Sequence, residues 1–192
     1  MSRFDHDYYH RYYGSQGVHA PEQVGHLATA VHEMAAWWGV EITSMLDVGA
    51  GVGMWRDWYR THHPQVHTRS TNVSEHACRT WGHEQRDIVT WQPDRTYDLV
   101  VCHSVLQYVA DRDVRAAAAH LARATEYVLY LEAPTTADLA HVVDPERTDM
   151  EVHHRAGEWY RALLGQWFQQ VGAGLWVKRG MVPMFELEAA AP

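Results

Sequence analysis

A glycine-rich segment between a short apolar run and a helical pattern constrains the fold of this chain most. Residues 46–53 read Leu-Asp-Val-Gly-Ala-Gly-Val-Gly. Glycines let the backbone turn sharply and approach a ligand closely, while the start of a helix offers unpaired N–H groups. In an open parallel sheet, ligands bind beyond the carboxyl ends of the strands. The segment therefore predicts a strand, a ligand-binding loop and a helix in that order.

Short apolar runs alternate with helical patterns along the rest of the chain, which predicts an α/β fold with a mostly parallel sheet. We expect helices at residues 21–38, 54–63, 74–81, 111–123 and 157–170. We expect strands at residues 43–49, 66–71, 97–103, 126–131, 175–179 and 183–188. The last two strands have no helix between them, so they should form an antiparallel hairpin at one end of the sheet.

Composition and length favour a single domain over residues 1–192. The 192 residues are 46% hydrophobic, which is enough for one well-filled core. The formal net charge of −8 disfavours binding to nucleic acid. Cys78 and Cys102 are too few for a disulfide framework, and neither a secretory signal nor a membrane-length apolar run is present in the sequence. We therefore expect a cytoplasmic protein that binds no membrane.

The glycine loop departs from two common nucleotide-binding motifs. A dinucleotide fingerprint requires Gly or Ala at position 54, where this chain has Met54. A triphosphate loop requires Gly-Lys-Ser/Thr, which does not follow the glycines. The run Leu-Asp-Val-Gly-Ala-Gly-Val-Gly instead resembles the first motif of class I S-adenosylmethionine-dependent methyltransferases.

Two further segments are similar to the same family. His83 to Ile88 (HEQRDI) looks like the end of its third strand, and Tyr97 to Val109 (YDLVVCHSVLQYV) is similar to its fourth strand and the following turn. The resemblance covers roughly residues 21–188. It implies a doubly wound, mostly parallel seven-stranded sheet with helices on both faces and a C-terminal antiparallel hairpin. It also implies S-adenosylmethionine as the cofactor.

The resemblance assigns the cofactor contacts to particular positions. These are Asp47, Gly49, Ala50, Gly51, Gly53, Asn72, Asp87, Ile88, Cys102 and His103. Asp87 would meet the adenine amino group, and the Ile88 backbone would lie beside the ring. The family usually carries Asp or Glu at the position of Asn72, where it binds the ribose hydroxyls. An amide loses the charge assistance of that bond, and Glu75 is a second candidate for the contact.

The resemblance also implies in-line attack of an acceptor atom on the sulfonium methyl. Alignment alone can supply about 7–11 kcal/mol, and a general base adds roughly 10²–10⁴-fold, so a base is helpful but optional. Candidate bases follow strand ends or precede the last long helix: His103, Glu132 and His154, of which His154 is expected to face the substrate together with His153. The adjacent pairs at 62–63 and 153–154 lack the ligand spacing of a zinc site, so no metal is predicted.

Two segments are expected to cover the site. Residues 1–20 contain tyrosines at helical spacing, which indicates either an aromatic face packed against the body or a lid that brings Tyr9 and Tyr13 to the substrate. Residues 134–152 show no clear period, and a loop of this length in a compact domain is usually functional or disordered. We interpret it as a substrate-specificity cover.

The turn after the fourth strand lacks the Asn/Asp-Pro-Pro-aromatic signature of methyltransferases that act on adenine rings or glutamine amides. The leading hypothesis is therefore methyl transfer to an O or N atom of a small molecule. Asn72 motivates an alternative, a non-catalytic or partner-dependent binding subunit. A nicotinamide-dependent oxidoreductase is a third hypothesis, against which Met54 argues. A monomer and a homodimer both fit the nine tryptophans.

Overall fold

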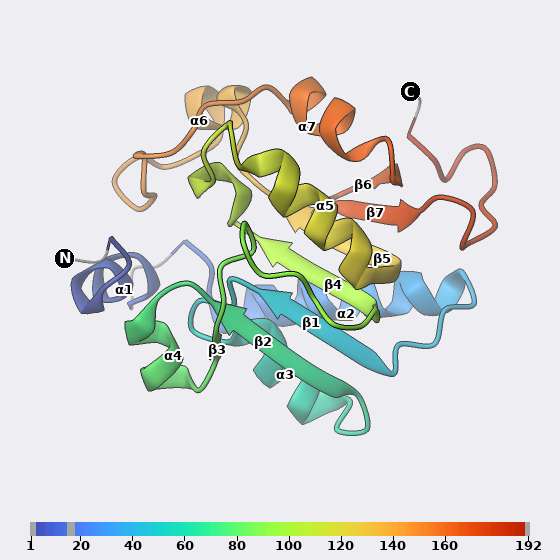
Figure 1. The fold of residues 1–192 in the computed structure, drawn as a ribbon, viewed down its shortest axis with the longest axis horizontal. Coiled ribbons are helices and arrows are strands. Elements are labelled where there is room, and N and C mark those ends of the chain that lie inside the picture. Colours follow the sequence, from blue (N-terminus) through green and yellow to red (C-terminus); the bar gives the residue numbers. More distant parts are fainter. Residues whose placement is uncertain (1–2, 15–17, 191–192) are drawn as a thin grey trace.

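The computed structural model describes residues 3–14 and 18–190, and within them it forms a seven-stranded sheet with helices on both faces (Figure 1). The strand order is β3-β2-β1-β4-β5-β7-β6. The first five strands are parallel: β1 (Ser44–Val48), β2 (His67–Asn72), β3 (Glu84–Gln85), β4 (Tyr97–His103) and β5 (Thr125–Glu132). The antiparallel pair β6 (Phe168–Gly172) and β7 (Leu175–Lys178) completes the sheet beside β5. The doubly wound α/β fold with a C-terminal antiparallel hairpin is thus confirmed.

The helices form a layer on each face of the sheet. In Figure 1, α5 (Val114–Ala124) crosses in front of the strands, while α2 (Pro21–Trp37) and α3 (Met54–His62) lie behind them. The remaining helical elements are α1 (His6–Tyr13), α4 (Glu75–Trp81), η1 (Leu106–Tyr108), α6 (Thr136–His141) and α7 (Gly157–Leu164). None of the helices in residues 3–14 and 18–190 combines the length and apolar character needed to cross a bilayer.

The central strands carry mostly apolar residues because both faces of the sheet are covered. All five residues of β1 are buried. Leu46 and Val100 pack in the core that includes α5 and α7, whereas Met45 and Leu99 pack in the core that includes α2 and α3. This division explains why β1 and β4 appear in the sequence as continuous apolar runs rather than as an alternating pattern.

The strand order reverses between β1 and β4. From β1 the chain proceeds to β2 and β3 on one side, and from β4 it proceeds to β5 on the other. The loops that follow β1 and β4 therefore diverge, which opens a crevice at the carboxyl ends of these strands. Because Asp47 pairs with Val101, the glycine loop starts beside the end of β4.

The predicted position of the hairpin is wrong. The expected helix over 157–170 ends at Leu164, and residues 168–172 form β6, which pairs with β7 around a turn at Ala173 and Gly174. Fully buried Phe168 accounts for this, since it fills the core from a strand position. Residues 183–188 form no strand, and Phe185 and Leu187 are 77% and 98% exposed, so their apolar pattern has no sheet face to cover.

The segment 134–152 is not a structureless loop, because it contains the short helix α6. Thr135 caps this helix: its side chain accepts from the Asp138 N–H, and the Asp138 carboxylate accepts from the Thr135 N–H at 2.8 Å. This reciprocal capping box explains why a helix forms in a stretch with no clear apolar period.

Asp98 ties the amino end of β4 to that of β1, and its removal is expected to destabilise the sheet. Its Oδ2 accepts from the N–H groups of Thr43 and Ser44, both at 2.8 Å, and from their hydroxyls at 2.7 and 3.0 Å. Asp98→Ala should lower the free energy of unfolding by about 2 kcal/mol, measured by urea denaturation at pH 7. Glu41→Ala, an exposed carboxylate in the same region, should change it little.

The Asp98 effect should also depend on pH. Burial raises the pKa of Asp98, but the bonds from Thr43 and Ser44 outweigh it and hold the pKa below its ordinary value. Its contribution is therefore present above the unfolded pKa of about 4 and is lost as the pH falls through the folded value. An unfolding difference between Asp98→Ala and wild type that stays constant down to pH 3 would contradict this.

Candidate functional site

Two cavities open at the carboxyl ends of β1 and β4, and they meet at the glycine loop. The larger has a volume of about 530 Å³ and the smaller about 330 Å³. Both are lined by six shared residues: Tyr8, Tyr13, Gly49, Gly51, Ser104 and Tyr108. The site is therefore one crevice with two compartments, divided where α1 lies over the loop.

Backbone conformation and close neighbours favour glycine at two positions of the loop, 49 and 51. Gly49 and Gly51 adopt left-handed φ angles of 71° and 58°. A Cβ at Gly49 would lie 2.4 Å from Cγ2 of Val105, and a Cβ at Gly51 would lie 3.3 Å from the Tyr13 ring. Side chains therefore approach the loop too closely to leave room for any residue larger than glycine at position 49.

Asp47 places a buried carboxylate at the larger cavity. It is 2% exposed, and its Oδ2 has no hydrogen-bond partner among the residues that the structure describes. Burial raises the pKa of Asp47 to about 7, although nearby His103 and Arg56 oppose that shift. A buried carboxylate without a partner is costly, so a cationic group bound in the cavity would be stabilised there.

The smaller cavity contains the predicted residues Asn72, Asp87 and Ile88. The Asn72 Oδ1 accepts from the Ser74 N–H at 2.9 Å, and the Asn72 side chain also hydrogen-bonds the Tyr9 hydroxyl. The amide NH₂ has two N–H groups, so one is left as a donor toward a ligand. The Asp87 Oδ1 accepts from the Val89 N–H at 2.9 Å. Glu75, the second candidate for the Asn72 contact, is exposed and pairs with Arg79.

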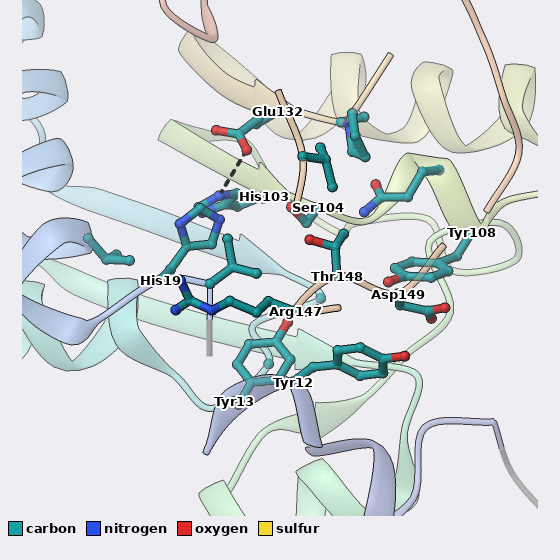
Figure 2. Close-up of a pocket in the computed structure, with 18 of the residues that line it drawn as sticks. Tyr12, Tyr13, His19, His103, Ser104, Tyr108, Glu132, Arg147, Thr148 and Asp149 are labelled. Atoms are coloured by element: carbon teal, nitrogen blue, oxygen red, sulfur yellow. Dashed lines mark ion pairs between the residues drawn. The ribbon is translucent and has the colours of Figure 1, made fainter. Parts of the chain in front are cut away.

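His103 and Glu132 form a connected pair on the wall of the larger cavity (Figure 2). His103 Nε2 lies 3.5 Å from Glu132 Oε1, and the Tyr130 hydroxyl donates to Oε2 at 2.8 Å. His103 and Tyr130 hold the pKa of Glu132 down to about 2, against burial, which raises it. Glu132 is therefore a fixed anion and a weak base.

Trp55 sets the tautomer of His103. Its Nε1–H donates to Nδ1 of His103 at 3.1 Å. Because the indole nitrogen can only donate, Nδ1 must be an acceptor, and the proton of the neutral ring lies on Nε2, which faces Glu132. His103 consequently has no free lone pair with which to accept a proton from a ligand.

His19 joins this pair, and the sequence analysis missed it. The ligand atoms of His19, His103 and Glu132 all lie within 4.8 Å of one another, and the two imidazole rings are 5.0 Å apart. Burial and His103 lower the pKa of His19, although Glu132 raises it. Nothing in its local sequence distinguishes His19 from the other fourteen histidines.

Two imidazoles and a carboxylate at this distance are a possible metal-ligand set. A metal at His103 Nε2 would need a lone pair on that nitrogen, but the bond from Trp55 to Nδ1 places the ring proton there. The tautomer therefore favours a hydrogen-bonded relay over a metal centre, and the absence of a metal stays a prediction.

The helix α1 covers the crevice from outside. The hydroxyls of Tyr8 and Tyr108 are 2.9 Å apart, and Arg3 pairs with Asp149 at 2.9 Å. Tyr13 lines both cavities, but Tyr9, predicted to contact the substrate, is 6% exposed and lines only the smaller cavity. The predicted lid also includes residues 1–2 and 15–17, which lie outside the described residues.

The segment 134–152 contributes a second cover. In Figure 2, Arg147, Thr148 and Asp149 lie along the larger cavity, and the Arg147 side chain extends toward His19. The apolar residues Val142 and Val143 line the same cavity. The predicted cover segment thus lies at the cavity. Its sequence has no clear apolar period, so it could not show which of its residues line the cavity.

Four predicted site residues lie outside the two cavities formed by the described residues. Cys102 is fully buried in the core under α5, and Gly53, with φ 90°, begins α3 beside the Arg56 side chain. His153 and His154 are exposed on the surface instead of facing a substrate.

Neighbouring Arg155 explains the position of the two histidines. It is 5% exposed, donates to the carbonyls of Leu106 and Val109, and pairs with Asp111 at 2.6 Å. With this side chain anchored inward, the residues before it face solvent. His154 therefore lies outside both cavities, and the geometry lends no support to its predicted role as the base.

Ser104 is a further residue that the sequence analysis missed. It lines both cavities with a left-handed φ of 58°, which is uncommon for a residue with a side chain. Its position directly after β4 was a usable signal, because ligand sites lie at strand ends. Tyr8, Tyr12 and Tyr108 were visible in the sequence only as aromatic residues.

The family model of the methyltransferase domain matches residues 21–183. Comparison with curated proteins finds no significant match.

Solved structures share the fold. Magnesium protoporphyrin IX methyltransferase (ChlM) from Synechocystis PCC 6803 is 20% identical with a TM-score of 0.58, over 90% of this chain and 93% of that one. The N-methyltransferase NodS from Bradyrhizobium japonicum WM9 is 15% identical with a TM-score of 0.56, over 84% and 90%. An S-adenosylmethionine-dependent methyltransferase from Clostridium acetobutylicum ATCC 824 is 13% identical with a TM-score of 0.56, over 72% and 77%.

Gly49→Ala should destabilise the protein more than Gly39→Ala. Both positions have positive φ, 71° and 76°, but only a Cβ at Gly49 meets a side chain. The left-handed conformation alone costs about 1–2 kcal/mol, and the overlap with Val105 should add about 1–3 kcal/mol. Chemical denaturation of the two variants measures the difference, and equal losses of stability would show that Val105 does not enforce the glycine.

Proposed function

We propose, because this chain belongs to the family of methyltransferase domains, that it transfers a methyl group from S-adenosylmethionine to an oxygen or nitrogen atom of a small molecule. The observation that carries the proposal is the buried Oδ2 of Asp47, which has no described partner, beneath a glycine loop at which two cavities meet. A ligand with a cationic amino-acid end and a flat, polar nucleoside end suits these two compartments.

Our proposal for cofactor binding divides the molecule between the cavities. The ammonium of its methionine moiety would pair with Asp47, next to Gly49 and Gly51. The ribose would receive hydrogen bonds from the Asn72 NH₂, and the adenine would lie beside Ile88 with its amino group toward Asp87. Asn72 thus offers the ribose a hydrogen-bond donor where the family usually has an acidic acceptor, and a ribose hydroxyl can accept such a bond.

The acceptor would occupy the rest of the larger cavity. Its walls combine aromatic and apolar side chains, which suit a small organic molecule: Tyr12, Tyr13, Val18, Met54, Trp55, Val142 and Val143. One wall of this cavity carries a cluster of three polar side chains, His19, His103 and Glu132. We propose that the covers formed by α1 and segment 134–152 exclude water and select the acceptor.

When bound, S-adenosylmethionine supplies an electrophilic methyl group whose transfer leaves S-adenosylhomocysteine. The chain's main task is to hold the acceptor atom in line with that methyl, an alignment that can supply about 7–11 kcal/mol. The glycine loop and the two covers would hold the acceptor and the cofactor against each other.

We propose that His19 takes the proton that the acceptor loses. Among the two histidines of the His19–His103–Glu132 group, His19 is the one whose ring lone pair is not used by a described contact. The lowered pKa of His19 keeps the ring neutral near pH 7. Once protonated, the His19 imidazolium would lie within 4.8 Å of the Glu132 carboxylate, which stabilises it. His103 would act through Glu132, by holding the carboxylate in place.

The acidic balance of the chain supports a small-molecule acceptor over nucleic acid. A cytoplasmic location and a monomeric or homodimeric state remain our proposals from the sequence.

The cofactor assignment predicts how the affinity for S-adenosylhomocysteine depends on Asp47. Calorimetry should detect binding to the wild type at micromolar concentration, and Asp47→Asn should weaken it by about tenfold through the loss of an ion pair. Because the pKa of Asp47 is raised to about 7, the wild-type affinity should rise as the pH increases from 6 to 8. The Asn variant should lack that rise.

Glu41→Gln, which removes an exposed charge at the opposite end of β1, is the matched control and should bind like the wild type. Failure of the folded wild-type protein to bind S-adenosylhomocysteine at high micromolar concentration would reject the cofactor assignment.

The proposed base predicts a loss of turnover without loss of cofactor binding. Once a screen of hydroxyl and amine metabolites with methyl-labelled S-adenosylmethionine identifies an acceptor, His19→Ala should reduce kcat by roughly 10²–10⁴-fold. Added imidazole should partly restore it, and the affinity for S-adenosylhomocysteine should stay unchanged. His26→Ala, an exposed histidine on α2, should keep full activity. Full turnover by His19→Ala would exclude His19 as the base.

A further inference from the structure

A buried polar cluster lies against the glycine loop at the carbonyl of Gly51. His83, which follows the end of α4 at Gly82, is 7% exposed, and Arg56 on α3 is 5% exposed. His83 Nε2 lies 3.1 Å from the carbonyl oxygen of Gly51. Its Nδ1 lies 3.1 Å from Nη1 of Arg56 and 2.9 Å from Oγ of Ser70 on β2.

The partners of His83 fix its protonation and its orientation. A guanidinium only donates, so Nδ1 of His83 accepts from Arg56, and the ring proton lies on Nε2. Nε2–H therefore donates to the Gly51 carbonyl. Arg56 is held in turn, because its Nη1 also donates to the Trp81 carbonyl at 2.6 Å and its Nε donates to Asp57 at 2.8 Å. The cluster is satisfied only with neutral His83 in this tautomer.

Gly51 is consequently fixed from both sides. The Tyr13 ring lies against its Cα on the cavity side, and the His83 ring holds its carbonyl from behind. A peptide unit is planar, so fixing the carbonyl of Gly51 also fixes the direction of the Val52 N–H. A glycine at φ 58° has little conformational preference of its own, and such a contact decides which way its peptide faces.

We propose that His83 is a positioning residue for cofactor binding: by holding the Gly51 carbonyl it keeps the glycine loop in the shape that accepts the amino-acid end of S-adenosylmethionine. This inference rests on the proposed function, since it assumes the cofactor lies on this loop. His83 lines neither cavity within the described residues, so it acts on the ligand only through the loop.

The same contacts make the loop sensitive to acid. The charged groups that act on His83 are Arg56, Asp57 and Arg60, all on α3. Burial and then Arg56 lower the pKa of His83, although the Gly51 carbonyl and Asp57 oppose this. His83 is neutral above the ordinary histidine pKa, and it gains a proton on Nδ1 as the pH falls through the lowered folded value. That proton removes the acceptor for Arg56 and sets two donors face to face, which displaces the ring that holds Gly51, although Nε2–H is still a donor.

The test compares three variants by calorimetry with S-adenosylhomocysteine at pH 8, where both His83 and Asp47 are deprotonated. His83→Phe keeps a ring but removes both polar contacts, and it should weaken binding about tenfold or more. His83→Gln can still donate to Gly51 and accept from Arg56, and it should stay within about threefold of wild type. His67→Phe alters an exposed histidine at the other end of β2 and should bind like the wild type.

Thermal unfolding without ligand separates positioning from stability. A purely structural histidine would lower the melting temperature of His83→Phe without changing the affinity of the folded protein, and that result would overturn the proposal. If His83→Phe does not fold, His83→Ala removes the same two contacts with less bulk and takes its place. It should bind about tenfold more weakly than His83→Gln, and equal affinities of the two folded variants would contradict a role for His83.

These outcomes differ from failure of the proposed function. If no protein in the series, including wild type, binds S-adenosylhomocysteine, the cofactor assignment itself is wrong. If all of them bind equally well, the assignment stands and the role of His83 is wrong.

Discussion

The parallel pairing of β1 with β4 is the constraint on which the site depends. It sets Asp47 opposite Val101 and brings the loop after β1 against the turn after β4, so that Val105 lies over Gly49. Both strands are buried on both faces, so their register is strongly fixed, and a shift of one residue would turn the Asp47 side chain to the other face. The crevice, the buried carboxylate and the requirement for glycine are thus consequences of one pairing.

The polar groups around the crevice differ in how many of their hydrogen-bonding atoms have a partner within the protein. Behind the loop, His83 has partners for both ring nitrogens and Arg56 has partners for Nε and Nη1. Asp87 and Asn72 each use one oxygen in a local turn. Asp47 alone among these keeps a buried oxygen without a described partner. The satisfied groups preorganise the backbone, and the unsatisfied one supplies the driving force for a cationic ligand.

Local sequence determined the elements near the site and failed where distant contacts decide. The run before Gly49 and the strand Tyr97–His103 were predictable because they are apolar on both faces, and Ser74 and Gly82 mark the ends of α4 by their capping chemistry. Phe168 was assigned to a helix because its neighbours have helical spacing, yet pairing with β7 makes it a strand residue. His154 was chosen and His19 was missed because the inward anchoring of Arg155 and the approach of residue 19 to β5 depend on tertiary structure.

A crystal structure of the protein grown with S-adenosylhomocysteine tests the central claim most directly. The account predicts density for the amino-acid end of the ligand within hydrogen-bonding distance of Asp47, along Gly49–Gly51, with the nucleoside in the cavity lined by Asn72 and Ile88. Density for the ligand elsewhere on the molecule, or an empty crevice filled by Tyr13 and Val105 in the presence of saturating ligand, would contradict it.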